Sequence, residues 1–318
     1  MTSIDLKVES IEAPAERIRS VVLVSAGGDA LPPYEAGAHM EFHLPDGTTR
    51  SYSLIDFEGD CAAPKSYRFG IRLEEESTGG SSYMHGLGEG DTVTADAPKN
   101  DFPLATDDAP SLLIAGGIGI TPMISMAAAL KSAGRPYSLH YAMRDRSAAA
   151  FTGRLAELHG DRVSLHFDDE AGGPLDLSGL VEGAEEGAHL YVCGPKPMIE
   201  AARSAAEAAG LPSGRIHFEL FDAPADQEGD TAFEVEIASS GKVYTIPPGR
   251  SIIDVLEEDG EDLIYDCQRG DCGICQTDVL EGEPDHRDVV LSEEERAGGK
   301  VMQICVSRAR SARLKLDL

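Results

Sequence analysis

Four cysteines have the residue type and spacing of an iron–sulfur site. Cys267, Cys272 and Cys275 stand in a C-x4-C-x2-C array, and Cys305 follows further along the chain. A plant-type 2Fe–2S cluster takes four thiolates, three of them from one short loop and the fourth from a distant segment. Glycines inside the array let the backbone wrap closely and direct N–H groups at sulfur. We therefore predict that these four cysteines are the ligands of a 2Fe–2S cluster.

A structural zinc site, a disulfide framework and unrelated thiols are the alternatives. Structural zinc sites usually pair two short cysteine knuckles, and this sequence has no second knuckle. Disulfides fit poorly, because the N-terminal MTSIDLKVES has no export signal and the six cysteines suit a reducing cytoplasm. His286 has no second histidine at Rieske spacing, so we expect an all-cysteine cluster. Such a centre carries single electrons, and the rest of the chain should supply them.

The charge of the chain limits its partners. Its net charge of −29 comes from 27 basic and 56 acidic residues, which excludes nucleic acid as a partner. The acids are spread along the sequence, which favours a role in solubility over one docking face, although both interpretations remain open. The uncharged run 112–130 contains glycines and a proline, so we expect a strand, a loop and a helix, and not a membrane span. We expect a cytoplasmic protein that is a monomer when free.

Residues 1–105 predict a small antiparallel β-barrel, because short stretches of alternating polarity are separated by turn residues. Within it, Arg50 can hold a phosphate, Tyr52 can pack on a flat ring, and Ser53 can donate hydrogen bonds to ring heteroatoms. The segment Ser77–Ser82 precedes a short expected helix at 83–87, where exposed N–H groups favour an anion. An ordinary edge strand and a capped helix are the alternatives. The expected strands are 4–11, 18–24, 39–44, 49–54, 66–73 and 92–97.

Residues 106–222 alternate strands with helices, which predicts a parallel, doubly wound sheet. A strand at 111–115 leads through GGIGITP into a helix at 121–131. Glycines there let a dinucleotide approach backbone amides at the start of a helix. Cys193 and Gly194 follow a strand at 188–192, at the end of the sheet where ligands bind. Cys193 has two interpretations, a contact beside a nicotinamide ring or a small buried residue.

The last part of the chain predicts a third domain. A polar linker at 223–231 precedes residues 232–318, which read as a hairpin, a helix at 252–258, the cysteine loop and later strands. We expect a strand at 301–306 to carry Cys305. The charged segment 285–288 is expected to be a solvated loop, with a loop that faces a partner as the alternative.

Taken in order, these motifs resemble the phthalate dioxygenase reductase family. Arg50-Ser51-Tyr52-Ser53 with Gly79-Gly80-Ser81-Ser82 resembles its flavin barrel, GGIGITP with Cys193-Gly194-Pro195 its nucleotide domain, and the C-terminal part a β-grasp ferredoxin. The resemblance implies FMN, with FAD the less favoured flavin, and NADH as the electron donor. Asp145 permits NADH, while Arg144 and Arg146 leave NADPH open. Ser77-Thr78 departs from the family's more usual Gly-Arg.

The resemblance also implies site residues and a partner. The residues implied to bind FMN are Arg50, Tyr52, Ser53, Ile71, Arg72, Gly79, Gly80, Ser81 and Ser82. Those implied to bind the nucleotide are Gly117, Gly119, Thr121, Cys193 and Gly194. Phe221, or alternatively Phe218, is expected to stack on the flavin, and a buried strand with one ring in the core is the other interpretation of this segment. No general acid or base is required, so no catalytic residue is nominated.

The implied function is electron transfer in an oxygenase system. The resemblance implies a reductase that takes a hydride from NADH onto FMN and passes single electrons through the cluster to a Rieske-type terminal oxygenase. One alternative is a reductase that serves a haem monooxygenase. The other is a metal-binding regulatory protein that uses a reductase scaffold.

Overall fold

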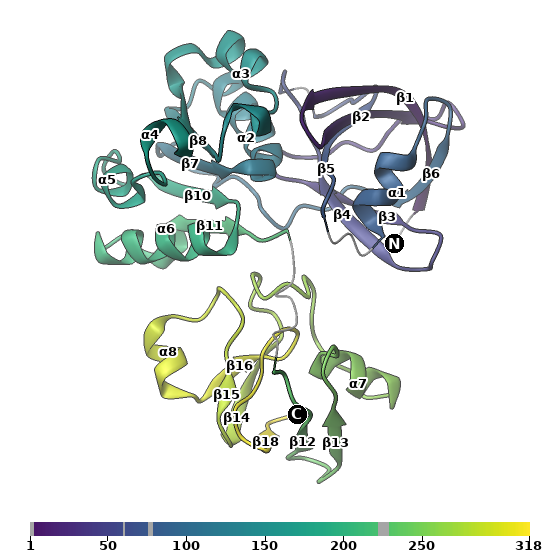
Figure 1. Ribbon diagram of the computed structural model, residues 1–318, viewed down its shortest axis with the longest axis vertical. Coiled ribbons are helices and arrows are strands. Elements are labelled where there is room, and N and C mark those ends of the chain that lie inside the picture. Colours follow the sequence, from purple (N-terminus) through teal and green to yellow (C-terminus); the bar gives the residue numbers. More distant parts are fainter. Residues whose placement is uncertain (1–2, 60, 76–78, 222–228) are drawn as a thin grey trace. The chain divides into compact units, whose positions relative to one another are not determined.

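The computed structural model describes residues 3–59, 61–75, 79–221 and 229–318 (Figure 1). It divides into two compact units, Met1–Glu219 (unit 1) and Leu220–Leu318 (unit 2). Unit 1 holds both the expected barrel and the expected doubly wound sheet, and unit 2 holds the cysteine array. The multi-domain fold class is confirmed, whereas the boundaries at 105/106, 222/223 and 231/232 stay predictions.

The first sheet of unit 1 is antiparallel and has the strand order β4-β3-β6-β1-β2-β5. A bridge between Leu54 and Phe69 joins its two outer strands, which closes the sheet into a barrel. Alternate side chains of the strands fill the interior, among them Phe42, Phe69 and Tyr67. The expected strands are present as β1 (Ser3–Ala15), β2 (Ile18–Ser25), β3 (His39–His43), β4 (Thr49–Ser53), β5 (Tyr67–Arg72) and β6 (Thr92–Asp96).

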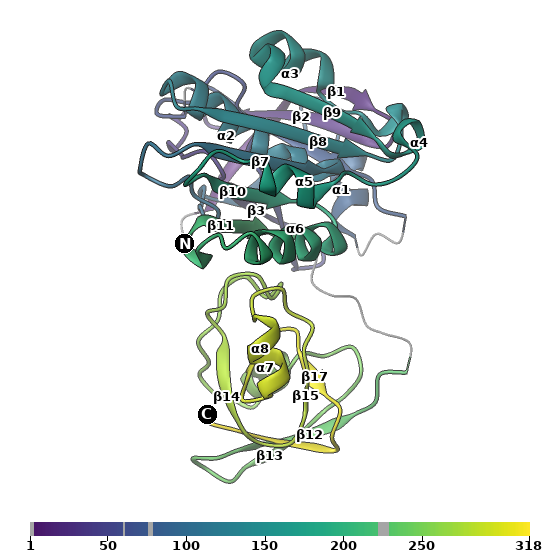
Figure 2. The ribbon, with the colours of Figure 1, turned by 90° about the vertical axis from the view of Figure 1, so that its left-hand side faces the viewer.

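The second sheet of unit 1 is parallel, with the order β11-β10-β7-β8-β9. Its order reverses between β7 and β10, and helices α3 and α6 lie above and below its strands in Figure 2. In such a sheet, ligands bind beyond the carboxyl ends of the strands at the reversal. Its strands are β7 (Ser111–Gly116), β8 (Tyr137–Met143), β9 (Val163–Phe167), β10 (His189–Cys193) and β11 (Ile216–Glu219).

The helices of unit 1 connect these strands. The expected helix at 83–87 begins earlier than predicted, because it includes the Gly-Ser-Ser segment. Two short helices, α4 and α5, were not predicted. The helices are α1 (Gly80–Gly86), α2 (Ile120–Ser132), α3 (Thr152–His159), α4 (Asp168–Ala171), α5 (Leu177–Glu182) and α6 (Lys196–Ala208), with short 3-10 turns η1 (Gly117–Gly119), η2 (Arg146–Ala148), η3 (Gly160–Arg162) and η4 (Ser213–Arg215).

Unit 2 has a mixed sheet with the order β13-β12-β18-β14-β16. Helix α7 begins with a capping box in which Ser251 and Asp254 bond to each other's backbone, as its sequence suggests. Helix α8 was not predicted. The elements are β12 (Phe233–Ile237), β13 (Val243–Ile246), α7 (Ile252–Glu258), β14 (Gln276–Glu281), β15 (Pro284–Asp285), α8 (Glu293–Gly298), β16 (Val301–Gln303), β17 (Arg308–Ala309) and β18 (Arg313–Leu316). Within the described part of the chain, no helix is long and apolar enough to cross a membrane.

Candidate functional site

The four predicted ligands come together in unit 2. Cys267, Cys272 and Cys275 lie in the loop between α7 and β14, and Cys305 lies just beyond β16. The expected strand at 301–306 is shorter than predicted, because β16 stops at Gln303 and a turn follows. Ile304 N donates to Cys275 O across 3.4 Å, so this turn carries Cys305 against the loop.

The four cysteine side chains are within hydrogen-bonding contact of one another. Cys272 and Cys305 hydrogen-bond to the sulfur of Cys267, which lowers the pKa of Cys267. A hydrogen bond from Cys305 likewise lowers the pKa of Cys275, whereas hydrogen bonding raises the pKa values of Cys272 and Cys305. These contacts bring the four sulfurs together, and cysteine sulfur is the donor that a 2Fe–2S cluster requires.

The backbone of the loop is shaped around the sulfurs. Arg269 N donates to Cys267 Sγ across 3.4 Å. Gly270 has a φ of +83°, and a Cβ there would lie 3.0 Å from Asp288 Cα and 2.7 Å from Val306 Cγ2. Only glycine fits this close approach, so the loop can curl beneath the 288–290 segment.

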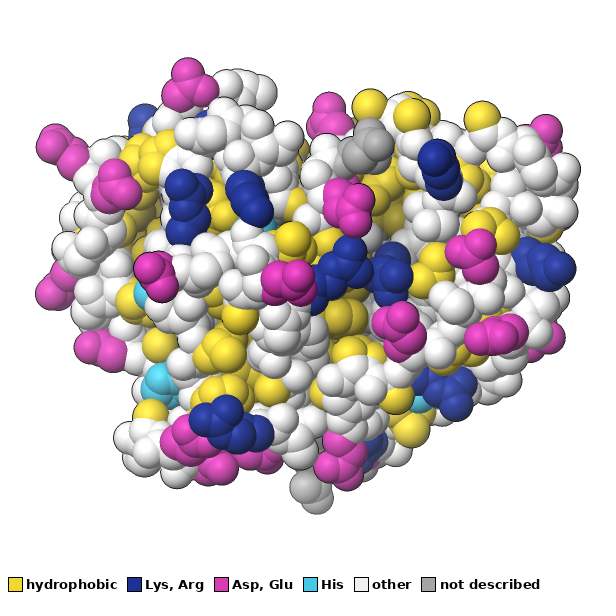
Figure 3. Space-filling view, turned by 90° about the horizontal axis from the view of Figure 1, so that it is seen from above, with side chains coloured by type: hydrophobic (Ala, Val, Ile, Leu, Met, Phe, Trp, Pro, Cys, Tyr) yellow, Lys and Arg dark blue, Asp and Glu magenta, His cyan; other side chains and the backbone are white. Residues whose placement is uncertain are grey.

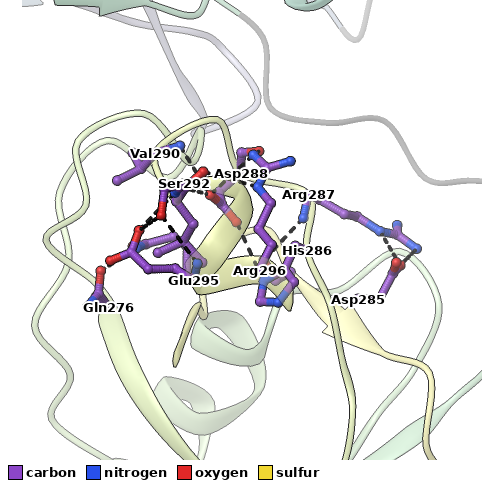
Figure 4. Close-up of polar contacts among 12 residues, drawn as sticks. Gln276, Asp285, His286, Arg287, Asp288, Val290, Ser292, Glu295 and Arg296 are labelled. Atoms are coloured by element: carbon purple, nitrogen blue, oxygen red, sulfur yellow. Dashed lines mark hydrogen bonds and ion pairs between the residues drawn. The ribbon is translucent and has the colours of Figure 1, made fainter. Parts of the chain in front are cut away.

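The segment 285–288 is not the solvated loop that we expected. Arg287 and Asp288 are both buried. The carboxylate of Asp288 accepts from Val290 N at 3.1 Å and Leu291 N at 2.8 Å, and Arg296 donates to its carbonyl at 2.6 Å (Figure 4). Val289 N in turn donates to Gly270 O at 3.0 Å. The segment is therefore a buried brace for the cysteine loop, held through the carbonyl of Asp288 and one of its two carboxylate oxygens.

The cysteine set differs from a site that binds a single metal ion. Within the described ranges, no three His, Cys, Asp or Glu side chains are grouped as ligands of one metal ion. A plant-type cluster needs no such group, since each of its two irons takes two protein thiolates. The cysteine set fits the binuclear group.

The nucleotide residues meet at the carboxyl ends of β7 and β10. A Cβ on Gly119 would lie 2.2 Å from Cys193 O, and one on Gly194 would lie 3.0 Å from Gly116 Cα. The two loops therefore pass each other backbone to backbone, which leaves no space for other side chains. Gly117 has a φ of +55° with open space beside it. Open backbone at the start of α2, at the reversal of the sheet, fits a dinucleotide phosphate.

Cys193 is fully buried at the end of β10, and Thr121 is buried with its hydroxyl donating to Ile118 O at 3.0 Å. Thr121 thus braces the turn that begins α2. The geometry places both residues at the expected edge of the sheet, and their contacts with a nucleotide stay predictions.

The residues that bear on NADH or NADPH follow β8. The Asp145 carboxylate accepts from Ser147 N at 2.8 Å and from Ser147 Oγ at 2.6 Å, and these bonds lower the pKa of Asp145. Arg146 donates to Glu170 at 3.0 Å and lies over the Phe167 ring. A ribose 2′-phosphate would have to compete with Glu170 for Arg146, which favours NADH.

The predicted flavin residues lie on two neighbouring parts of the barrel. Arg50, Tyr52 and Ser53 are on β4, and Tyr52 packs edge-on against Phe42 with ring centroids 5.8 Å apart. A Cβ on Gly80 would lie 2.5 Å from Arg50 Cγ, so the start of α1 rests on the arginine side chain. Glycine there lets Arg50 lie beside the N–H groups of α1, which fits a phosphate held by both.

The other predicted flavin residues differ in exposure. Ile71 is buried in the barrel core, and its carbonyl accepts from His85, so only its backbone is available to a ligand. Arg72 is exposed beside Glu74. Ser81 Oγ accepts from Glu74 N at 3.1 Å, Gly79 has a φ of +108°, and Ser82 lies in the first turn of α1. Ser77 and Thr78 lie outside the described residues.

Two candidate aromatics occur near the end of unit 1. Phe218 lies in β11 beneath the Arg203 guanidinium, which is 4.8 Å from the ring centroid. Phe221 belongs to unit 2 and is half-buried. Its expected stacking on the flavin stays a prediction.

Sequence reasoning missed the contacts that join the flavin and nucleotide parts. Ser125 of α2 donates to Leu54 O at 2.7 Å and accepts from Asp56 N at 2.8 Å, directly after β4. A Cβ on Gly70 of β5 would lie 2.9 Å from Thr121 Cγ2. A glycine inside a predicted strand is a signal of such close approach, whereas Ser125 gives no signal. The two predicted binding regions are thus adjacent within unit 1.

The surface charge has no single focus on the face drawn in Figure 3. Acidic side chains are scattered there, and Lys and Arg side chains lie among them. This agrees with the interpretation that the acids spread along the sequence serve solubility.

Comparisons with known proteins agree with this geometry. Residues 235–310 match the family model of the 2Fe-2S iron-sulfur cluster binding domain, and residues 113–204 match that of the oxidoreductase NAD-binding domain. The chain is 44% identical to phenoxybenzoate dioxygenase subunit beta of Ectopseudomonas oleovorans, with 100% of this chain and 98% of that protein covered. It is 41% identical to tetrachlorobenzoquinone reductase of Sphingobium chlorophenolicum, with coverages of 100% and 99%.

Among solved structures, phthalate dioxygenase reductase is similar, with a TM-score of 0.75 and 37% sequence identity. The match covers 99% of this chain and 98% of that one, and that structure is described as a modular one for electron transfer from pyridine nucleotides to [2Fe-2S]. The similarity therefore spans the flavin, nucleotide and cluster regions together.

Proposed function

Since the chain belongs to the phthalate dioxygenase reductase family, we propose that its electrons go to a Rieske-type terminal oxygenase. The chain is an NADH-dependent flavin and iron–sulfur oxidoreductase, with FMN, NADH and a 2Fe–2S cluster as its cofactors. The Rieske partner is the proposal, supported by relatives such as phthalate dioxygenase reductase and phenoxybenzoate dioxygenase subunit beta. Reducing surroundings suit six cysteines that form no disulfide, so the proposal places the protein in the cytoplasm.

The relatives carry the partner assignment, and the hydrogen bonding of Ser125 supports the electron path within unit 1. By holding Leu54 O and Asp56 N, Ser125 fixes the start of α2 beside the end of β4. The residues proposed to bind the nucleotide and those proposed to bind FMN are thereby held in one rigid frame. Such positioning is the main contribution that a protein makes to transfer between two cofactors.

Different residues of the chain are proposed to bind each of the three cofactors. When bound, FMN accepts a hydride as an electron pair from NADH and releases single electrons to the cluster. Arg50 and the amides at Gly80–Ser82 are proposed to hold the flavin phosphate, with Tyr52 packed on the flavin. Gly117, Gly119 and Gly194 leave room for the nucleotide, while the four cysteines hold the cluster. No side chain need act as a general acid or base.

The test compares three electron acceptors with the purified holoprotein and NADH. These are the oxygenase component of phthalate dioxygenase, a purified haem monooxygenase and tetrachlorobenzoquinone. Faster reduction of the Rieske oxygenase, with anaerobic NADH bleaching both flavin and cluster absorbance, is expected. Preferential reduction of the haem protein or of the quinone would overturn the Rieske assignment. Mass spectrometry of the released flavin checks FMN.

A colourless protein that contains zinc would instead support the regulatory hypothesis. The Cys272→Ser variant is the matched control, because it removes one cluster ligand from unit 2 and leaves unit 1 unchanged. It should keep NADH-driven flavin reduction and lose electron transfer to the oxygenase.

A further inference from the structure

Unit 2 has an open groove of about 490 Å³ beside the cysteine loop. It is lined by residues from the β12–β13 hairpin, the loop after α7, the start of β14 and the chain after β18. Three of its lining residues are chain neighbours of cluster ligands: Ile274 and Gln276 flank Cys275, and Ile304 precedes Cys305. The groove therefore borders the segments that carry Cys275 and Cys305, although no cysteine itself lines it.

The floor and wall of the groove carry exposed apolar side chains. Ile264 is 80% exposed and Ile274 is 49% exposed, although both are large aliphatic residues. Ile304 beneath them is buried. Exposed aliphatic side chains gathered at one groove, and not scattered singly, are typical of a surface that another molecule covers.

The rim of the groove is acidic. Its lining residues, all of them described, include Glu261, Asp262, Asp278 and Asp317 and no Lys, Arg or His. Lys242 lies 2.7 Å from Glu261 and balances that charge. Among the described residues, no basic side chain is within ion-pair distance of the other three carboxylates, and Asp317 N bonds to Asp278 O, which holds two of them together. An apolar centre with a negative rim complements an apolar surface ringed by Lys or Arg.

We infer that this groove docks the protein that receives electrons from the cluster, through a basic rim around an apolar centre on that protein. The inference rests on the proposed function, since it requires electrons to leave through the cluster. Docking at Ile264 and Ile274 brings the acceptor against the loop of Cys272 and Cys275, and the acidic rim raises the rate of encounter at low salt.

The test uses cytochrome c as a basic one-electron acceptor and ferricyanide as a small anion that needs no docking groove. Ile264→Ser and Asp278→Lys should each raise the KM for cytochrome c about fivefold to tenfold at low salt. The effect of Asp278→Lys should fade in high salt, because screening removes the charge attraction. NADH-driven ferricyanide reduction and the rate of cluster bleaching should stay at wild-type values.

Matched controls come from the same unit. Leu280→Ser removes an aliphatic side chain of β14 that is 49% exposed, against 80% for Ile264, and that does not line the groove. Glu294→Lys reverses an exposed charge on α8. Both should leave the KM for cytochrome c unchanged. An equal loss in Glu294→Lys would assign the charge effect to net charge, and an equal loss in Leu280→Ser would assign the other effect to any exposed aliphatic side chain. Either result would overturn the inference.

Two other results would also overturn it. One is a wild-type KM in both groove variants, or a wild-type protein that reduces ferricyanide and not cytochrome c. The other is slower bleaching of the cluster in the groove variants, which would make the groove part of electron transfer within the chain. Failure of the proposed function is distinct, because the wild-type protein would then reduce the haem monooxygenase or the quinone in preference to the Rieske oxygenase, whatever the groove variants do to the KM for cytochrome c.

Discussion

The cluster site of unit 2 and the nucleotide–flavin site of unit 1 are built in different ways. Three of the proposed cluster ligands come from one loop, and side-chain sulfur would provide the binding chemistry. In unit 1, loops far apart in the sequence meet, and the absence of side chains at Gly119, Gly194 and Gly80 makes the meeting possible. Damage to the first site should remove a ligand and spare the fold, whereas damage to the second should strain the fold and the site together.

Cys305→Ser should have the largest effect, complete loss of the cluster. The Cys305 sulfur is in hydrogen-bonding contact with both Cys267 and Cys275, so its removal takes away a ligand at the centre of the set. Iron content and visible cluster absorbance should fall to background, while NADH still reduces the flavin of unit 1. Cys61→Ser, in unit 1, should keep the cluster. Full iron content in Cys305→Ser would refute the ligand assignment.

Gly119→Ala should strain unit 1 severely. Its Cβ would lie 2.2 Å from the carbonyl oxygen of Cys193, and neither backbone can move aside cheaply. We expect a loss of about 3 kcal/mol in the free energy of unfolding of unit 1, together with a raised KM for NADH. Gly117→Ala, with a φ of +55° and open space, should cost only about 1 kcal/mol. Urea unfolding measures both, and equal costs would refute the steric argument.

The same contrast explains what the sequence could predict. The cysteine array and the period of each strand are local patterns, so the ligands and the elements of the barrel and sheet follow from short stretches. The burial of Asp288 does not, because it depends on Arg296 and on Gly270 of the cysteine loop. The pairing of Arg146 with Glu170 and the bonds of Ser125 also depend on distant partners. From sequence alone, a charged segment is therefore predicted to be exposed to solvent, because its distant partners cannot be identified.

Gly80→Ala should have a milder effect than Gly119→Ala. The added Cβ would meet Arg50 Cγ at 2.5 Å, and a flexible side chain can swing away where a backbone cannot. We expect little loss of stability, about 1 kcal/mol, but a roughly tenfold weaker flavin affinity, because Arg50 is displaced. Gly86→Ala in the same helix meets nothing within 4 Å and should stabilise α1 slightly. Flavin titration of the apoprotein measures both affinities, and unchanged affinity in Gly80→Ala would count against Arg50 as a phosphate ligand.

The last prediction, one of pH, concerns residues at the amino ends of the unit 1 strands. His189 bonds to Asp107 at 3.1 Å and to His217 at 2.9 Å, and His217 stacks on Tyr191 with ring centroids 4.5 Å apart. Burial, with a further contribution from His189 and opposed by Asp107, lowers the pKa of His217 to about 4. These three side chains are distant in sequence, as are the loops that meet at the nucleotide and flavin sites of unit 1.

The direction of the pH effect follows from that lowered pKa. In the unfolded chain His217 gains a proton near its ordinary pKa of about 6.5, whereas the folded unit gains it only near pH 4. The stability of unit 1 should therefore fall as the pH drops from about 6.5 to about 4, and this contribution should then level off. His217→Phe keeps an aromatic ring beside Tyr191 and cannot be protonated, so its stability should fall less over that range. Calorimetry of both proteins across this range tests the difference in stability. An NMR titration that gives His217 a pKa near 6.5 in the folded protein would contradict the prediction, because the lowered pKa is its physical basis.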